Sequence, residues 1–224
     1  GGAAPALDEW DQPSWVRWKF DDLVTLNQHP QEVIDNICDY GHLGPIHGST
    51  VERYENEFKG HLATQRQCGP HRTLVDEHGG QPILHTITTY HGPGVLISNM
   101  TGMHDAILMI THTPIEDGSI KVWHALLVKS PGGNSEVNTQ DVIAARQFQQ
   151  ASLHAFMQDF EVWMNKAPCL NGLFIPSDGP FMKARVWYKQ FYNPRSMSQE
   201  FTEQSDGVYV PKGAVPYSQQ SSSL

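Results

Sequence analysis

The first periodic stretch of the chain begins at Pro30, whose fixed backbone angle suits the first turn of a helix. The apolar residues that follow it recur at helical intervals, namely Val33, Ile34, Ile37 and Cys38. This spacing predicts a short helix that buries one of its faces.

A second and longer stretch, residues 135–166, contains no Gly or Pro and follows a Pro-Gly-Gly-Asn loop, so it predicts the longest helix. One face of this helix carries Phe148, Ser152, Ala155, Phe156, Asp159 and Trp163. A carboxylate on such a face needs a proton, an ion pair or a cation. Glu161 lies away from that face, and Asp141 sits in the first turn, where the helix dipole accounts for an acid.

Between these helices, apolar and polar residues alternate in short runs that are separated by Gly-containing turns. The expected strands are His61–Gln67, Arg72–Glu77, Ile83–Tyr90, Val95–Asn99, Ala106–His112 and Ile120–Val128. The pattern predicts an α+β fold of the helix-grip kind, as in START and Bet v 1-like domains. In that fold a curved antiparallel sheet wraps on a long C-terminal helix, and the cavity between them is the natural ligand site.

Two later segments give weaker signals. Pro176-Ser-Asp178-Gly-Pro180 predicts a helix N-cap followed by a short helix through Arg185, Trp187, Tyr188 and Phe191, which we expect to pack on the outside of the sheet. The tail from Gly213 onward has no apolar period and is expected to be disordered.

Composition narrows the class of protein. A length of 224 residues suits one domain with a sizeable core, and a net charge of −9 argues against a nucleic-acid partner. No apolar run approaches the roughly 18 residues of a membrane span. The three cysteines, Cys38, Cys68 and Cys169, make a disulfide framework improbable and indicate a reducing, cytoplasmic compartment.

The candidate chemistry lies just after the first predicted helix. His42 and His47 flank a helix-breaking Gly44-Pro45, and Asp39 precedes His42 by one turn, where it is placed to orient the imidazole. A pair of histidines in a chain with twelve of them can equally be structural. With Asp159 as a third ligand, however, the set becomes a two-histidine, one-carboxylate triad, which selects non-haem Fe(II) and leaves positions open for dioxygen.

The run Asn-x-x-Asp-x-x-His-x4-His, with a single Asp in a late helix, resembles the catalytic domain of Rieske-type non-haem iron oxygenases. Three further segments look like the oxygenase component of bacterial 3-ketosteroid 9α-hydroxylases, with the cholesterol 7-desaturases as the nearest other branch. They are His29-Pro-Gln-Glu-Val33, Glu57-Phe-Lys-Gly-His-Leu-Ala-Thr-Gln65 and His112-Thr-Pro-Ile115. The resemblance covers roughly residues 10–194.

The resemblance implies that His42, His47 and Asp159 bind Fe(II), and that dioxygen hydroxylates a steroid-like or other large hydrophobic substrate. It also implies that Asp39 passes electrons from the Rieske cluster of a neighbouring subunit in a homotrimer, with a ferredoxin reductase as partner. Asn36 is expected to tune access to the iron, or to be an ordinary residue of the helix surface.

One departure from the family pattern concerns the electron donor. A Rieske 2Fe–2S cluster needs two Cys and two His, and none of the three cysteines stands in a Cys-x-His or Cys-x-x-His arrangement. The expected organisation is therefore a start at 1–9 that is disordered or artificial, a catalytic domain at 10–195, and an extension with a disordered tail at 196–224. The start without Met favours a fragment whose Rieske domain precedes it over a stand-alone relative. The alternative functions are a lipid- or steroid-binding helix-grip module and a sterol desaturase without redox activity of its own.

Overall fold

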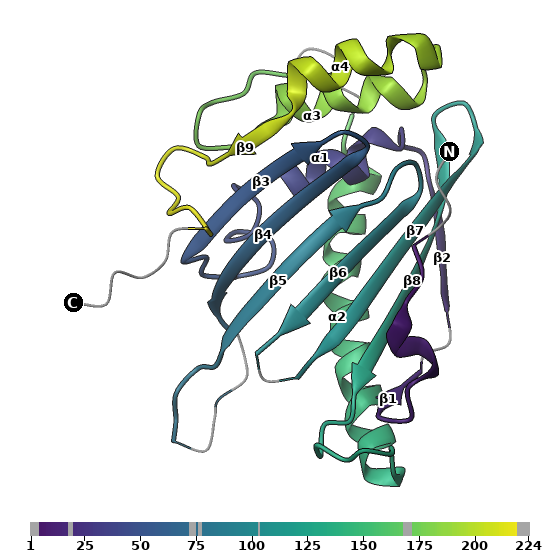
Figure 1. Ribbon diagram of the computed structural model, residues 1–224, viewed down its shortest axis with the longest axis vertical. Helices are drawn as coiled ribbons and strands as arrows, with labels where there is room; N and C mark the ends of the chain where they lie inside the picture. Colours follow the sequence, from purple (N-terminus) through teal and green to yellow (C-terminus); the bar gives the residue numbers. More distant parts are fainter. Residues whose placement is uncertain are drawn as a thin grey trace.

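A computed structural model of the chain describes residues 5–17, 20–71, 75, 78–102, 104–167 and 172–218. In this part of the chain, nine strands form one antiparallel sheet in the order β1-β8-β7-β6-β5-β4-β3-β9, and β2 also pairs with β8. One long helix runs along a face of the sheet, and the other helices gather at one end (Figure 1). The α+β class predicted from the sequence is confirmed.

The strands, in chain order, are β1 Trp15–Val16, β2 Asp21–Leu26, β3 Arg53–Lys59, β4 Leu62–Pro70, β5 Ile83–Tyr90, β6 Val95–Thr101, β7 Ala106–Glu116, β8 Ser119–Lys129 and β9 Gly207–Tyr209. The helices are α1 Gln31–Cys38, α2 Thr139–Asn165, α3 Phe181–Tyr188 and α4 Ser198–Ser205. Short 3-10 turns lie at η1 Asp8–Asp11, η2 Lys189–Phe191 and η3 Arg195–Met197.

The predicted meander corresponds to strands β4 to β8, each paired with the next along the chain. The expected strand Arg72–Glu77 falls outside the described residues except for Val75, which is not in a strand. The sequence analysis missed β3 and the short strands β1, β2 and β9. These three short strands find their partners, β8 and β3, far away in the sequence.

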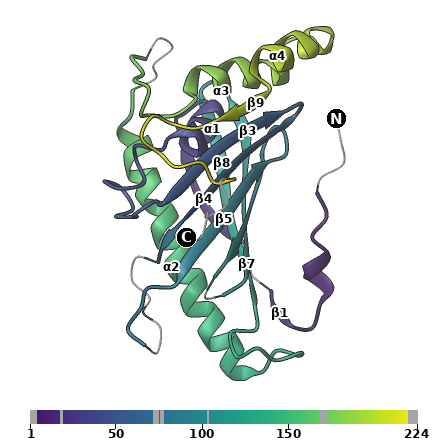
Figure 2. The same cartoon turned by 60° about the vertical axis from the view of Figure 1, so that its left-hand side comes forward.

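Helix α2 packs on the inner face of the sheet, chiefly against β8, and extends along the whole length of the strands (Figure 2). It begins at a capping box in which the Asn138 side chain accepts hydrogen bonds from the amides of Gln140 and Asp141. The Asp141 carboxylate in turn accepts from the Asn134 side chain and from the Asn138 amide, which lowers its pKa to about 2. The Asp141 carboxylate therefore serves as part of the N-terminal cap of α2.

The main core lies between α1, α2, α3 and the inner face of the sheet. Helix α3 does not pack on the outside of the sheet, as the sequence analysis expected. Its Ala184, Trp187 and Tyr188 are buried in this core beside Phe58 and Tyr90, and α3 also contacts α1. Asp178 also does not cap α3, since its carboxylate accepts from the Ile175 amide.

The C-terminal region, expected to be an extension and a disordered tail, contacts the sheet as far as residue 218. Strand β9 pairs with β3, and the amide of Tyr54 donates to the carbonyl of Val215 over 2.8 Å. Farther along, the Tyr217 hydroxyl lies 3.1 Å from His85 Nδ1, and the Ser218 amide donates to Glu55. The described part of this segment therefore belongs to the packed unit.

Candidate metal centre

The histidine pair lies on a compact turn that follows α1. The helix ends at Cys38, and the chain from His42 to Ser49 then folds back through hydrogen bonds from the amides of Ile46 and Gly48 to the carbonyls four residues earlier. This turn brings the rings of His42 and His47 to a centroid distance of 5.1 Å at an interplanar angle of 76°. The five-residue spacing thus works because the histidines lie on a turn outside the helix.

Helix α2 supplies the carboxylate. Asp159 is 7 % exposed, and its Oδ1 lies 3.4 Å from His47 Nε2. One ligating atom from each of His42, His47 and Asp159 lies within 4.8 Å of the other two. The structure therefore brings together the three residues that the sequence analysis predicted as metal ligands. They come from the turn after α1 and from α2, which are more than a hundred residues apart in the chain.

Each histidine has an oxygen acceptor at its Nδ1 atom. His42 Nδ1 lies 2.7 Å from the backbone carbonyl of Asp39, and His47 Nδ1 lies 3.2 Å from Gln158 Oε1. These oxygens hold the hydrogen of a neutral imidazole on Nδ1, so the Nε2 lone pairs are left to face the cluster. Burial is the main cause that lowers the pKa of His42 and keeps it in the neutral form a metal needs.

Asn36 and Asp39 occupy different places at this centre. The Asn36 Nδ2 donates to Asp159 Oδ1 over 3.1 Å, so Asn36 faces the cluster and fixes the carboxylate. Asp39 orients His42 mainly through its main chain, because its Oδ2 is 3.6 Å from His42 Nδ1 while its Oδ1 accepts from the His42 amide. Burial raises the pKa of Asp39 although its side chain remains 32 % exposed.

The loop before α3 holds Asp39 in place. The amide of Tyr40 donates to the carbonyl of Asp178 over 2.8 Å. Gly179 has a φ of +136°, and a Cβ atom there would lie 1.8 Å from the carbonyl oxygen of Cys38. Only glycine allows this approach, which fastens the loop to the end of α1.

The donor set fits a divalent cation of the iron type. Two neutral imidazoles and one carboxylate place three electron-pair donors within 4.8 Å of one another. Such atoms attract one another only when a proton or a cation lies between them. The other acids weighed from the sequence lie elsewhere, since Glu161 is exposed on α2 and Asp141 caps that helix. Within the described part of the chain, His42, His47 and Asp159 are the His, Cys, Asp or Glu side chains that lie close enough together, as a group of three, to hold one metal ion.

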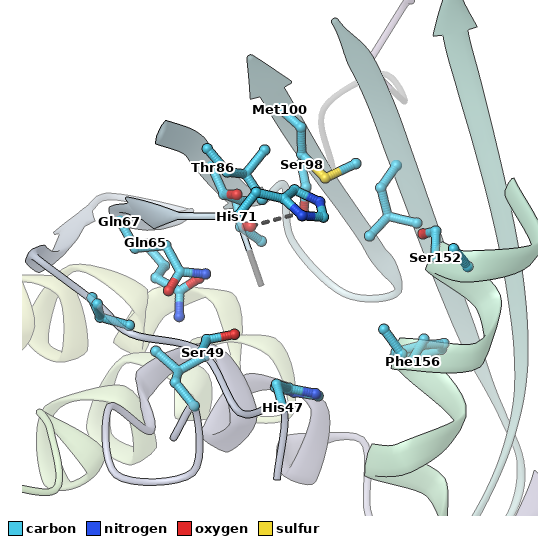
Figure 3. A pocket seen from close by; sticks show the side chains of 18 of the residues that line it. His47, Ser49, Gln65, Gln67, His71, Thr86, Ser98, Met100, Ser152 and Phe156 are labelled. Atoms are coloured by element: carbon cyan, nitrogen blue, oxygen red, sulfur yellow. Dashed lines mark hydrogen bonds between the residues drawn. The ribbon is translucent and has the colours of Figure 1, made fainter. Parts of the chain in front are cut away.

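A cavity of about 560 Å³ adjoins the cluster, and Asn36, His42, His47 and Asp159 line it. Figure 3 shows Ser152 and Phe156 on α2 at one side and strand residues such as Gln65 and Thr86 at the other.

Polarity changes across the strand wall of this cavity. One row of paired residues runs from Gln65 through Thr88 and Ser98 to Leu108, so it is polar on β4 and β5 and apolar on β7. The α2 wall is mostly apolar and carries Phe148, Ala151, Ala155 and Phe156. Such a cavity suits a mainly apolar ligand with a few hydrogen-bonding groups.

Two features of the site were not found from the sequence. Gln158, which holds His47, is the neighbour of Asp159 on α2, and sequence spacing does not show that its side chain reaches back to the turn. The second feature is His124 on β8. It is fully buried, and its two ring nitrogens lie within hydrogen-bonding distance of Asp21 and Ser152.

Comparison with known proteins defines the family. The chain belongs to the family of the 3-ketosteroid 9α-hydroxylase C-terminal domain, whose model matches residues 2–192. It is 29 % identical over 196 residues to a 3-ketosteroid-9-alpha-monooxygenase oxygenase component of Rhodococcus rhodochrous, covering 84 % of this chain and 51 % of that protein. It is 23 % identical over 196 residues to cholesterol 7-desaturase of Caenorhabditis elegans, covering 75 % of this chain and 44 % of that one.

Among solved structures, NdmA of Pseudomonas putida CBB5 with caffeine shares the fold, with a TM-score of 0.58 and 14 % identity. The alignment covers 93 % of this chain and 61 % of NdmA. The chain spans about half the length of the curated relatives it matches. No helix in the described ranges is long and apolar enough to cross a bilayer. The resemblance stated from the sequence motifs is thus confirmed at the level of the family.

Proposed function

We propose that the chain is the catalytic domain of a Rieske-type oxygenase that uses one Fe(II) and dioxygen to hydroxylate a steroid-like or other large hydrophobic substrate. The observation that carries this proposal is the meeting of His42, His47 and Asp159 at a cavity with an apolar helix wall. The steroid class rests on the names of the relatives.

In this proposal the chain's own residues hold and shape the centre. His42 and His47 bind the metal through Nε2, with their rings fixed by Asp39 and Gln158. Asn36 restrains the Asp159 carboxylate by donating to it. Iron bound in this way supplies the oxidising chemistry and keeps positions open for dioxygen.

Electron entry is proposed to occur at Asp39. Its carboxylate is partly exposed at the surface, while its main chain contacts His42. A Rieske 2Fe–2S cluster of a neighbouring subunit is the proposed donor, fed by a ferredoxin reductase. The proposed assembly is a homotrimer, in which head-to-tail contacts between subunits close into a ring.

A second candidate function is a lipid- or steroid-binding module of the helix-grip kind. The long helix against a curved sheet, with a cavity between them, supports it without any metal. The two candidates differ in their dependence on iron. A binding module holds a hydrophobic ligand without iron and does not depend on His42.

Anaerobic titration with Fe(II) tests the oxygenase proposal. The chain should bind about one Fe(II), and both Asp159→Ala and the similarly sized Asp159→Asn should lose stoichiometric binding, because one charged ligand is gone. His154→Ala serves as the control, since His154 is exposed on the same helix and does not line the cavity. Full iron affinity in both Asp159 variants would disprove the ligand set.

A further inference from the structure

Three polar side chains form a continuous chain from the surface to the cavity. Asp21 on β2 stands opposite His124 on β8, with 3.1 Å between Asp21 Oδ2 and His124 Nδ1. His124 Nε2 lies 3.2 Å from the hydroxyl of Ser152 on α2, which lines the cavity. The Asp21 side chain is 43 % exposed, whereas His124 is fully buried.

The carboxylate sets the direction of every hydrogen bond in this chain. An ionised carboxylate only accepts, so the hydrogen of the neutral His124 ring must stand on Nδ1 and point to Asp21. Nε2 then has only a lone pair and must accept from the Ser152 hydroxyl. Burial, which outweighs the opposing contact with Asp21, lowers the pKa of His124 and favours this neutral form.

The hydroxyl of Ser152 has one hydrogen, and that hydrogen is taken by His124. Toward the cavity, Ser152 therefore presents lone pairs, and its neighbours Ala151, Ala155 and Phe156 offer no polar side-chain atom there. A ligand hydroxyl that donates to Ser152 continues the chain in the same direction, whereas a ligand ketone meets only another acceptor.

We propose that Ser152 is a specificity-determining residue that accepts a hydrogen bond from a hydroxyl group of the ligand and disfavours a ketone at the same place. For the steroid class of ligand, this inference rests on the proposed function. Ser152 precedes Asp159 by seven residues on the same face of α2, about 10 Å along the helix. The ligand hydroxyl is thus placed two helical turns away from the candidate metal centre.

The same order of groups occurs in hydrolases with a nucleophilic serine, but the surroundings of Ser152 differ from theirs. Acyl transfer needs N–H donors aimed at the developing oxyanion. Ser152 lies in the middle of α2, where the neighbouring amides are used in the helix. The arrangement therefore serves recognition.

The tautomer of His124 can be measured without any ligand or metal. In the iron-free chain at neutral pH, 15N NMR should find the hydrogen of His124 on Nδ1. Asp21→Leu, at a partly exposed position, should remove this preference. A wild-type hydrogen on Nε2 would overturn the proposal, because Ser152 would then be free to donate to the ligand.

The ligand preference is tested with androstanedione, a diketone, and its four mono-alcohols, which are the two epimers obtained by reducing each ketone in turn. Binding to the iron-free chain is measured by equilibrium dialysis. One of the alcohols should bind about tenfold more tightly than the diketone, the ratio that one added hydrogen bond gives. Ser152→Ala should abolish that preference and change the affinity for the diketone less than twofold, whereas Ser152→Thr, which keeps the hydroxyl, should retain it.

Equal binding of all five steroids, a preference that survives in Ser152→Ala, or binding of none of them would each overturn the proposal. Failure of the proposed function is distinguishable, because it would appear as absent Fe(II) binding in the titration. The steroid comparison uses protein without iron.

Discussion

Two histidine-containing groups lie along one face of α2, the pair His42 and His47 and the single His124, and they differ in what stands opposite Nε2. At the candidate metal centre, His42 and His47 meet Asp159, and two turns earlier His124 meets Ser152. In both groups an oxygen holds the Nδ1 hydrogen, so the imidazoles are oriented in the same way. The two groups differ in the side-chain atom that lies opposite Nε2.

The difference shows how one tautomer serves two purposes. The Nε2 atom of His47 faces a carboxylate oxygen at 3.4 Å, and two acceptors at that distance require a proton or a cation between them. The Nε2 atom of His124 faces a hydroxyl that supplies its own hydrogen. The first group therefore leaves a place for the cation that the proposed function requires, and the second is complete without one.

The largest contrast is expected between His42→Ala and His124→Ala. His42→Ala should eliminate stoichiometric Fe(II) binding and cost less than about 2 kcal/mol in the free energy of unfolding. His124→Ala should leave iron affinity within about twofold but cost about 2–4 kcal/mol, because it deletes a fully buried ring that stacks on Phe156.

Iron titration and urea unfolding measure the two effects separately. If His124→Ala also lost iron, or if His42→Ala unfolded the chain, the two groups would not be independent.

A smaller effect is expected where a single side chain holds one of the metal histidines. Gln158→Leu removes the acceptor on His47 Nδ1 and should weaken Fe(II) binding about 10–100-fold, the range seen for residues that orient metal ligands. Gln158→Glu keeps an acceptor and should restore most of the affinity. Gln150→Leu, on an exposed position of α2, is the matched control. Unchanged affinity in Gln158→Leu would show that the turn alone orients His47.

The sequence predicted the parts of this molecule that depend on local pattern. Strand β5 and the cores of β6 to β8 follow from alternation and Gly turns, and the grouping of His42, His47 and Asp159 follows from spacing and from one acid on an apolar stripe. Strand β3 was missed because its sequence, Arg-Tyr-Glu-Asn-Glu-Phe-Lys, reads as polar. Glu55 there is nevertheless buried, and Arg66 on the paired strand β4 compensates its charge.

Contacts between elements that are far apart in the chain could not be predicted from local sequence pattern. Helix α3 was expected on the outside of the sheet, because its pattern shows an apolar face but not the surface that covers it. Likewise, the partners of His124 come from β2 and α2, and only the β2–β8 pairing places Asp21 opposite its ring. The sequence pattern therefore shows Ser152 only as one residue on the apolar face of the helix, and not its proposed role in ligand recognition.

The smallest effect on iron is expected for Asp39→Ala, and it sharpens the contrast with Gln158. The main-chain carbonyl that holds His42 Nδ1 at 2.7 Å remains in this variant, whereas the lost carboxylate is 3.6 Å away. Fe(II) affinity should therefore fall less than about tenfold, below the usual effect of removing a residue that orients a metal ligand.

Electron entry gives Asp39→Ala a second readout. If its partly exposed carboxylate carries electrons toward the centre, reductase-driven turnover of the full oxygenase should fall far more than iron affinity does. Equal losses in the two measurements would mean that Asp39 acts only through His42. Because the carbonyl orients the ring and the carboxylate reaches the surface, the two functions of this residue can be separated by one substitution.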